Sequence, residues 1–140
     1  QLAESLGVPF VINARVDVFL RAHADLPAQI TEAVARGNAY LAAGADCVYP
    51  IGTLDRATIA ALTAQIAGPV NILGGPGAPT IADLAALGVA RVSLGGRLMS
   101  ALLGHLRAVV RDLNERGTYD RMMEPAAPPV GLSSLFGGES

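Results

Sequence analysis

The sequence predicts an α/β fold in which short parallel strands alternate with helices, and three observations indicate it. The 140 residues are 51% hydrophobic and 4% aromatic, which favours a packed domain of small aliphatic side chains. A helix end followed at once by a strand start recurs in residues 6–11, 43–48 and 87–92, with a looser copy in 67–72. Segments of helical periodicity separate these strand starts, and strands joined through helices are parallel.

Each repeated pattern places a Gly just before a short apolar run. Gly adopts the left-handed conformation that closes a helix, and the run is too short for a helix but typical of a buried strand. The four strands are expected near Phe10–Ala14, Cys47–Pro50, Val70–Leu73 and Arg91–Leu94.

Two helices are expected between the first three strands, and each has a start signal. Pro27 suits the first turn of a helix that runs through Leu41, because proline needs no hydrogen-bond partner there. Thr53 or Asp55 can cap the next helix, residues 57–66, by accepting a bond from a free N–H group.

Two more helices follow the third and fourth strands. Residues 80–83 (TIAD) resemble a capping box that opens a short helix. The longest helix runs from about Arg97 to Arg116, where leucines and valines recur at helical spacing, and Gly117 ends it. The Pro-rich remainder, residues 118–140, is expected to be an irregular tail.

Four strand-helix units amount to half of a (β/α)₈ barrel, which uses about 250 residues for eight. The competing architecture, a doubly wound open sheet, needs about five strands with helices on both faces. Residues 1–6 read as the last turns of a helix and no initiator Met precedes them, so we expect a truncated chain. The prediction is therefore the C-terminal half of a TIM barrel in residues 1–117, followed by the tail.

Composition limits the classes of function. The formal net charge is -2, which does not suit a nucleic-acid binder. No apolar stretch reaches the roughly 18 residues that a membrane span needs, so no membrane partner is expected. The single cysteine, Cys47, excludes an internal disulfide and favours a reducing compartment, so we expect the protein in the cytoplasm.

Polar side chains gather on one side of the first expected strand. Asn13, Arg15 and Asp17 alternate with Ile12 and Ala14, so they share a face. Active sites of (β/α)₈ barrels lie at the C-terminal ends of the strands, where Arg15 offers a planar fork of donors for a carboxylate or phosphate. Alternatively, Arg15 pairs with Asp17 only to hold a loop, and the residues alone leave both interpretations open.

Further candidates lie on the third and fourth strands. Asn71 is polar in an apolar run before the Gly-rich loop 74–79, and a buried Asn needs partners, which are either the neighbouring strand or a ligand. Gly95 and Gly96 start the last helix, where backbone N–H groups can bind an anion or the glycines serve only the turn. No HExxH, CxxC or DxD pattern occurs, so no metal ligand is assigned.

Two longer motifs carry a family resemblance: residues 11–17 (VINARVD) and residues 38–50 (NAYLAAGADCVYP). The first resembles the "-AR-D-" strand of the isocitrate lyase and phosphoenolpyruvate mutase superfamily, and the second resembles its "AYLEAGAD-IFPE" unit. Residues 69–72 and 84–93 fit the last two barrel units of that superfamily, and the resemblance extends to about Gly117.

The resemblance implies a site and a chemistry. Arg15 would bind a carboxylate or phosphonate of a small 2-oxo-acid-type substrate, and Asn71 would bind the substrate with it, both as catalytic residues. The reasoning from the residues themselves adds Asn13, Gly95 and Gly96 to the substrate-binding set. Mg²⁺ assists the cleavage or formation of a C–C or P–C bond, and its ligands are expected in the missing N-terminal half of the barrel. The last helix implies a homo-oligomer, and this chain alone is expected to be inactive.

One departure and two alternatives accompany this interpretation. Ile51 stands where many lyases of the superfamily carry Glu, which argues against an isocitrate-type cleavage. The first alternative is a non-catalytic, truncated or degenerate paralogue that acts only in subunit association. The second is an unrelated phosphate-binding barrel that uses Gly95 and Gly96.

Overall fold

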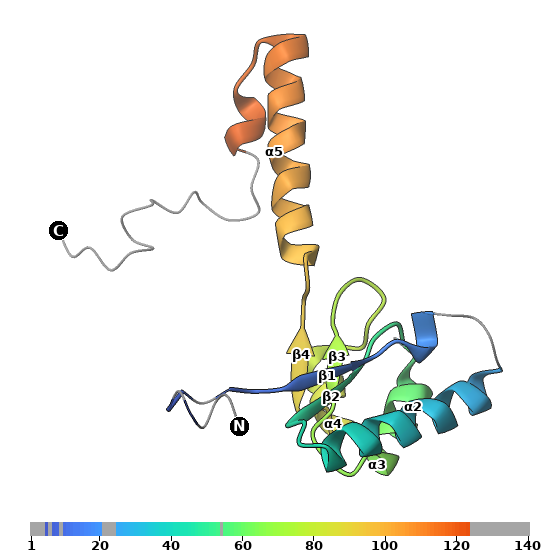
Figure 1. Ribbon diagram of the computed structural model, residues 1–140. Coiled ribbons are helices and arrows are strands. Elements are labelled where there is room, and N and C mark those ends of the chain that lie inside the picture. Colours follow the sequence, from blue (N-terminus) through green and yellow to red (C-terminus); the bar gives the residue numbers. More distant parts are fainter. Residues whose placement is uncertain (1–4, 6, 9, 21–24, 54, 124–140) are drawn as a thin grey trace. The chain divides into compact units, whose positions relative to one another are not determined.

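The computed structural model describes residues 5, 7, 8, 10–20, 25–53 and 55–123 (Figure 1). The chain divides into two units, Gln1–Gly95 and Gly96–Ser140, which we describe separately. Residues 124–140, which make up most of the predicted tail, lie outside the described residues. None of the helices in the described part is long and apolar enough to cross a membrane.

Strands and helices alternate through the first unit. Its elements are β1 (Asn13–Val16), the 3₁₀ helix η1 (Val18–Leu20), α2 (Leu26–Ala42), β2 (Cys47–Pro50), α3 (Arg56–Gln65), β3 (Asn71–Leu73), α4 (Ile81–Ala86) and β4 (Arg91–Ser93). β1 pairs with β2 and β3 with β4, both in parallel, and a parallel bridge between Val48 and Val70 joins the two pairs. The predicted α/β fold with parallel strands is confirmed.

The helix boundaries follow local chemistry. Asp25 accepts a hydrogen bond from the N–H of Ala28 at the start of α2, and Asp55, not Thr53, does the same for α3. At the other ends of α2 and α4, Gly44 and Gly88 take φ values of 100° and 82°, the left-handed conformation that the repeated pattern predicts. The looser copy of the pattern, in residues 67–72, does not follow this rule. α3 ends on an extended residue, and no left-handed Gly follows it.

β1 lies further along the chain than predicted. The expected strand was Phe10–Ala14, whereas the parallel ladder begins at Asn13 and ends at Val16. The reason is the partner strand: β2 has only four residues, and its register sets Asn13 beside Cys47 and Val16 beside Pro50. Strand limits are therefore set by pairing, which the apolar run alone does not reveal.

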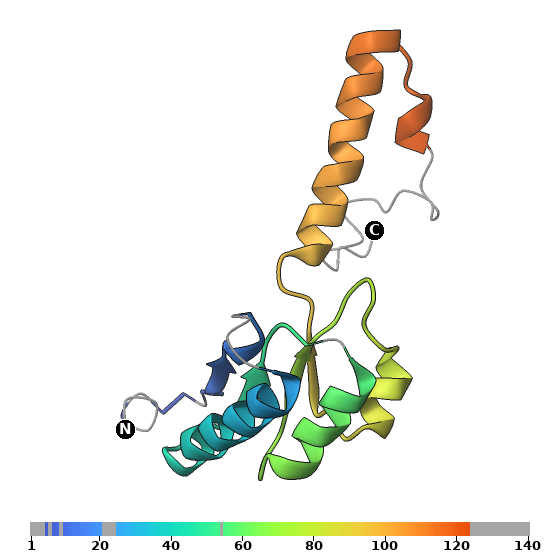
Figure 2. The same ribbon diagram turned by 90° about the vertical axis from the view of Figure 1, so that its right-hand side faces the viewer.

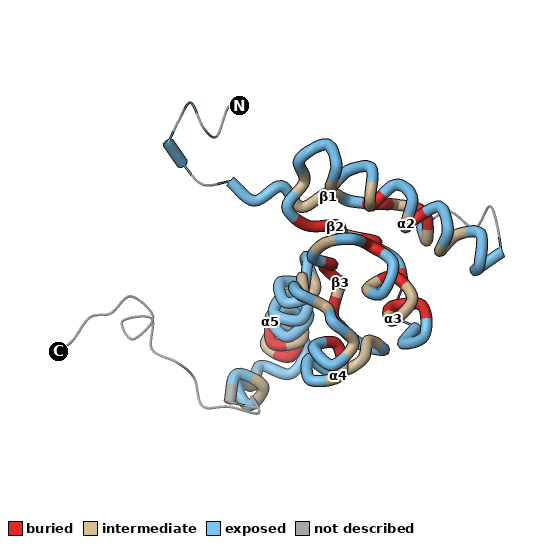
Figure 3. The backbone as a smooth tube through the Cα atoms, turned by 90° about the horizontal axis from the view of Figure 1, so that it is seen from below, coloured by how far each residue is buried: buried red, intermediate tan, exposed pale blue. Residues whose placement is uncertain are grey.

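The core of the first unit lies between the strands and the helices α2, α3 and α4 (Figures 2 and 3). Its buried residues are Val16, Val18, Ala33, Val48, Ile59, Leu62, Ile66, Val70, Ile72 and Leu84. α2 and β2 approach closely at Gly37 of α2, where an added Cβ would lie 3.0 Å from Cγ1 of Val48. Burial of these aliphatic side chains is the main force that stabilises the unit.

The second unit consists of α5 (Arg97–Arg116) and the 3₁₀ helix η2 (Asp120–Met123), and Figure 1 shows η2 folded back beside α5. Gly117 ends α5 with φ of 66°, as predicted, and its N–H donates to the carbonyl of Leu113. Asp112, only 9% exposed, pairs with Arg116 at 3.1 Å and with Arg121 at 3.8 Å. This carboxylate therefore ties η2 to the helix.

Candidate functional site

The strands of the first unit have one face toward the helices and one face away from them. Val16, Val48 and Ile72 belong to the core with α2, α3 and α4, and successive side chains of a strand point to opposite faces. The opposite face, which we call the site face, carries Asn13, Arg15, Cys47, Tyr49, Asn71, Leu73, Arg91 and Ser93. All three predicted residues of the strands, Asn13, Arg15 and Asn71, thus share one face.

Arg15 is held by the next acidic residue along the chain. Nε of Arg15 donates a hydrogen bond to Oδ1 of Asp17 at 2.5 Å, and Nη2 of Arg15 donates one to Oδ2 of Asp17 at 3.0 Å. These bonds, chiefly, raise the pKa of Arg15 above its usual value. The two side chains remain 54% and 38% exposed, so the pair is open to solvent.

Tyr49 lies beside Arg15 in the parallel register of β1 and β2. Neighbours in a ladder have side chains on the same face, so the phenol and the guanidinium share the site face. Tyr49 also contributes, as the last of several causes, to the raised pKa of Arg15. The sequence motifs did not single out Tyr49, because alternation along one strand does not give the register with the next.

Asn13 has an oxygen that lacks a partner. Its Oδ1 is buried and accepts no hydrogen bond from the described residues. A buried amide oxygen without a donor is destabilising, so such an atom in a native protein calls for an explanation, such as a ligand or a neighbouring segment. Asn13 is two residues from Arg15 on the same face, which makes this oxygen part of the candidate site.

Asn71 is fully buried and is held by Ser93 of the neighbouring strand. Its Nδ2 donates to Oγ of Ser93 at 2.9 Å, and that hydroxyl donates to Oδ1 of Asn71 at 3.1 Å. The amide still has one N–H and one lone pair beyond these two bonds. A role in substrate binding stays a prediction, and Ser93, a polar residue in a short apolar strand, is a site residue that the sequence reasoning missed.

Gly95 and Gly96 fall at the junction of the two units. Gly95 takes φ of 55°, a conformation that favours glycine. Gly96 is the N-cap residue of α5 and has no side chain to cap the helix, although its carbonyl accepts a bond from the N–H of Ser100. The turn therefore explains Gly95, and anion binding at this pair stays a prediction.

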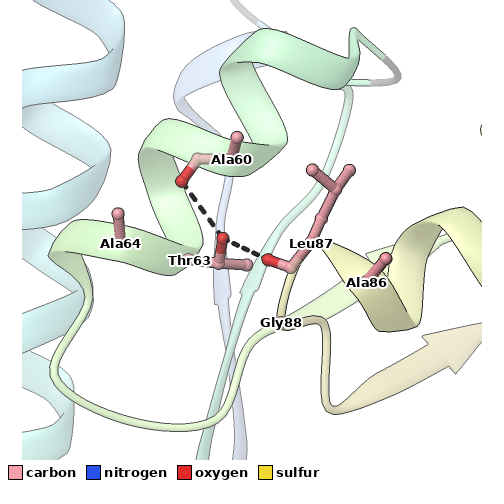
Figure 4. Close-up of a pocket in the computed structure, with 6 residues that line it drawn as sticks. All are labelled: Ala60, Thr63, Ala64, Ala86, Leu87 and Gly88. Carbon is pink, nitrogen blue, oxygen red and sulfur yellow. Dashed lines mark hydrogen bonds between the residues drawn. The ribbon is translucent and has the colours of Figure 1, made fainter.

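Other features of the described residues do not provide catalytic groups. No three His, Cys, Asp or Glu side chains in the described ranges gather in a way that could hold a metal ion. Cys47 is buried, and desolvation raises the pKa of its thiol, which disfavours the reactive thiolate. An open hollow of about 400 Å³ lies between α3 and α4, on the helix side, and Ala and Leu side chains and the Thr63 hydroxyl line it (Figure 4).

Comparison with known proteins gives the site a context. The sequence model of the phosphoenolpyruvate phosphomutase family matches residues 1–114. Two uncharacterized proteins of Mycobacterium tuberculosis, from strains CDC 1551 / Oshkosh and ATCC 25618 / H37Rv, are each 48% identical over 91 residues, which cover 64% of this chain. The chain therefore spans only about a third of the length of these relatives, since the match covers 33% of each.

Solved structures resemble the chain over most of its length. A protein of Burkholderia cenocepacia J2315, provisionally described as a lyase/mutase, is 35% identical with a TM-score of 0.76, covering 89% of this chain and 44% of that one. 2,3-Dimethylmalate lyase, described as a member of the PEP mutase/isocitrate lyase superfamily, has a TM-score of 0.69 over 96% of this chain and 45% of its own. At 22% identity, this second likeness supports the fold alone.

Proposed function

Because this chain belongs to the phosphoenolpyruvate phosphomutase family, we propose that it is the substrate-anion part of an enzyme that cleaves or forms a C–C or P–C bond in a small 2-oxo acid. We also propose that β1 to β4 are the last four strands of a (β/α)₈ barrel. The provisional lyase/mutase description of the Burkholderia relative supports this class of reaction.

The observation that carries the proposal is that a cation and a buried amide oxygen without a hydrogen-bond donor both lie on the site face. Arg15 supplies N–H donors for a carboxylate or phosphonate, and the buried Oδ1 of Asn13 requires a donor that the described residues do not supply. Asn71 has remaining donor and acceptor capacity on the same face. In the proposed enzyme Arg15 binds the acid group, the remaining N–H of Asn71 donates to another substrate oxygen, and Oδ1 of Asn13 accepts a hydrogen bond from a hydroxyl group or water bound beside them.

No group of three or more His, Cys, Asp or Glu side chains gathers among the described residues, so none of them is assigned to Mg²⁺. We propose that the ligands of the ion in this family lie outside the described residues, and that the site face contributes only the anion-binding groups. Titration of the 140-residue chain with Mg²⁺ in a calorimeter checks this division, and specific binding at low concentration contradicts it.

Substitution of Arg15 by Ala tests the substrate-binding role. In the intact protein, kcat/KM for the best substrate in a panel of small 2-oxo acids and phosphonates, assayed with Mg²⁺, is expected to fall at least about tenfold. Arg36→Ala is the matched control, because Arg36 is also half-exposed and paired with a carboxylate, but lies on α2. An unchanged kcat/KM for Arg15→Ala contradicts the assignment.

A second candidate function is subunit association, with or without catalysis. The observation that favours it is the large apolar surface of α5, where Leu98, Leu102 and Leu106 are 61%, 61% and 56% exposed. These residues recur every fourth position and therefore share one side of the helix. We propose that this side mediates a homo-oligomer of the intact protein.

A further inference from the structure

Asp17 occupies one edge of the Arg15 guanidinium and leaves another edge open. An Arg side chain has five N–H donors in a rigid plane. The bonds to Asp17 use the Nε–H and one N–H of Nη2, at 2.5 Å and 3.0 Å. The other three donors, both on Nη1 and one on Nη2, have no acceptor among the described residues.

The open donors include two parallel N–H groups, one on each terminal nitrogen. Their spacing matches the two oxygens of a carboxylate, which is why Arg binds carboxylates in pairs of hydrogen bonds. Pairing with Asp17 and binding of a substrate anion therefore use different edges of the same fork. The two interpretations of Arg15 that the sequence leaves open are compatible.

The ion pair offers the fold little stability but gives Arg15 a fixed orientation. Both side chains are more than one third exposed, and exposed ion pairs contribute little to stability because solvent screens them. Two simultaneous bonds nevertheless fix the plane of a long side chain that otherwise samples many rotamers. Arg15 lies within β1, and Asp17 follows the last residue of the strand directly, so the two partners are close along the chain.

We propose that Asp17 is the positioning residue of Arg15: it holds one edge of the guanidinium so that the other edge receives a carboxylate of the substrate. This inference rests on the proposed function, because it takes Arg15 as the anion-binding residue. Asp17 acts through Arg15 and does not touch the substrate. The opposite view is that Asp17 competes with the substrate, in which case its removal would strengthen anion binding.

Calorimetric titration of the intact protein with oxalate, a simple dicarboxylate, tests the proposal. Asp17→Ala is expected to weaken oxalate binding about tenfold, with the melting temperature unchanged. Asp17→Asn keeps one acceptor oxygen, so it is expected to weaken oxalate binding less than Asp17→Ala does. In turnover, KM is expected to rise more than kcat falls. The matched control is Glu32→Ala, which removes an equally exposed ion pair with Arg36 on α2 and is expected to leave oxalate binding unchanged.

The variant Arg15→Ala separates failure of this inference from failure of the proposed function. If Arg15→Ala leaves oxalate binding unchanged, the proposed function is wrong. If Arg15→Ala weakens binding while Asp17→Ala leaves it unchanged or strengthens it, only the positioning role is wrong. The double variant is expected to bind oxalate as Arg15→Ala does, because Asp17 affects the anion only through Arg15. If the losses of oxalate-binding free energy in the two single variants add up in the double variant, the positioning role is also wrong.

Discussion

Asp83 shows how single side chains of this fold respond to pH. Arg56 donates to its Oδ1 at 2.7 Å and the Thr80 hydroxyl donates to its Oδ2 at 2.8 Å, and these bonds lower the pKa of Asp83, the first more than the second. A lowered pKa in the folded state means that the unfolded chain binds the proton more readily. The stabilisation is therefore present above the ordinary pKa of about 3.9 and is lost as pH falls through the folded value.

Substitution of Asp83 by Asn isolates this contribution. At neutral pH the variant is expected to melt at a lower temperature than the wild type, because a neutral amide binds Arg56 less strongly. The difference is expected to shrink as pH falls from about 4 through the lowered pKa of the folded state, where the wild-type carboxyl becomes protonated. Thermal melts followed by circular dichroism over this range provide the measurement. A constant difference at all pH values contradicts the mechanism.

The sequence predicted which side chains share a face within one strand, but not which residues of the neighbouring strands join them in the candidate site. Alternation in β1 correctly predicted that Asn13 and Arg15 share a face, and the apolar run of β3 made Asn71 conspicuous as a buried polar residue. Tyr49 and Ser93 were missed because they join the site through the register between strands. Their signal was present but weak, since each is a polar side chain at an alternate position of a short strand.

The contact between α2 and β2 illustrates packing at the scale of elements. Gly37 lets the helix approach the strand so closely that an added Cβ would lie 3.0 Å from Val48 and 3.4 Å from Ile66. Gly37→Leu is expected to lower the free energy of unfolding by about 1–3 kcal/mol, measured by urea denaturation, because a tight core tolerates extra atoms poorly. Ala35→Leu, at an exposed position of the same helix, is the control. Equal stability of the two variants contradicts this role of Gly37.

The helices α2 to α5 and the strands β2 to β4 were predicted closely, whereas β1 was not, and the reason for this difference is physical. Helix limits depend on neighbouring residues, so the caps and Pro signals placed α2, α3, α4 and α5 within a few residues of their observed ends. Strand limits depend on a partner that is distant in sequence, which is why β1 begins at Asn13 and not at Phe10. The family resemblance, carried by residues 11–17 and 38–50, is confirmed by the family match over residues 1–114.

At the scale of the whole molecule, the two units differ in how they bury apolar surface. Among its described residues, the first unit has a core of ten buried residues between its strands and helices. α5 of the second unit instead exposes leucines at positions 98, 102, 103 and 106. An exposed apolar surface of this kind marks a contact with another chain or another part of the same protein. Our proposal assigns it to a homo-oligomer.

Introducing charge on this surface tests the assignment. The double variant Leu102→Glu and Leu106→Glu is expected to shift the intact protein to a smaller assembly, because burying two carboxylates in an apolar contact is strongly unfavourable. Size-exclusion chromatography with light scattering measures the mass. Arg111→Glu is the control, since nine residues at about 100° each place Arg111 on the opposite side of the helix from Leu102. A wild-type protein that is already monomeric, or a double variant with the wild-type mass, contradicts an oligomer through α5.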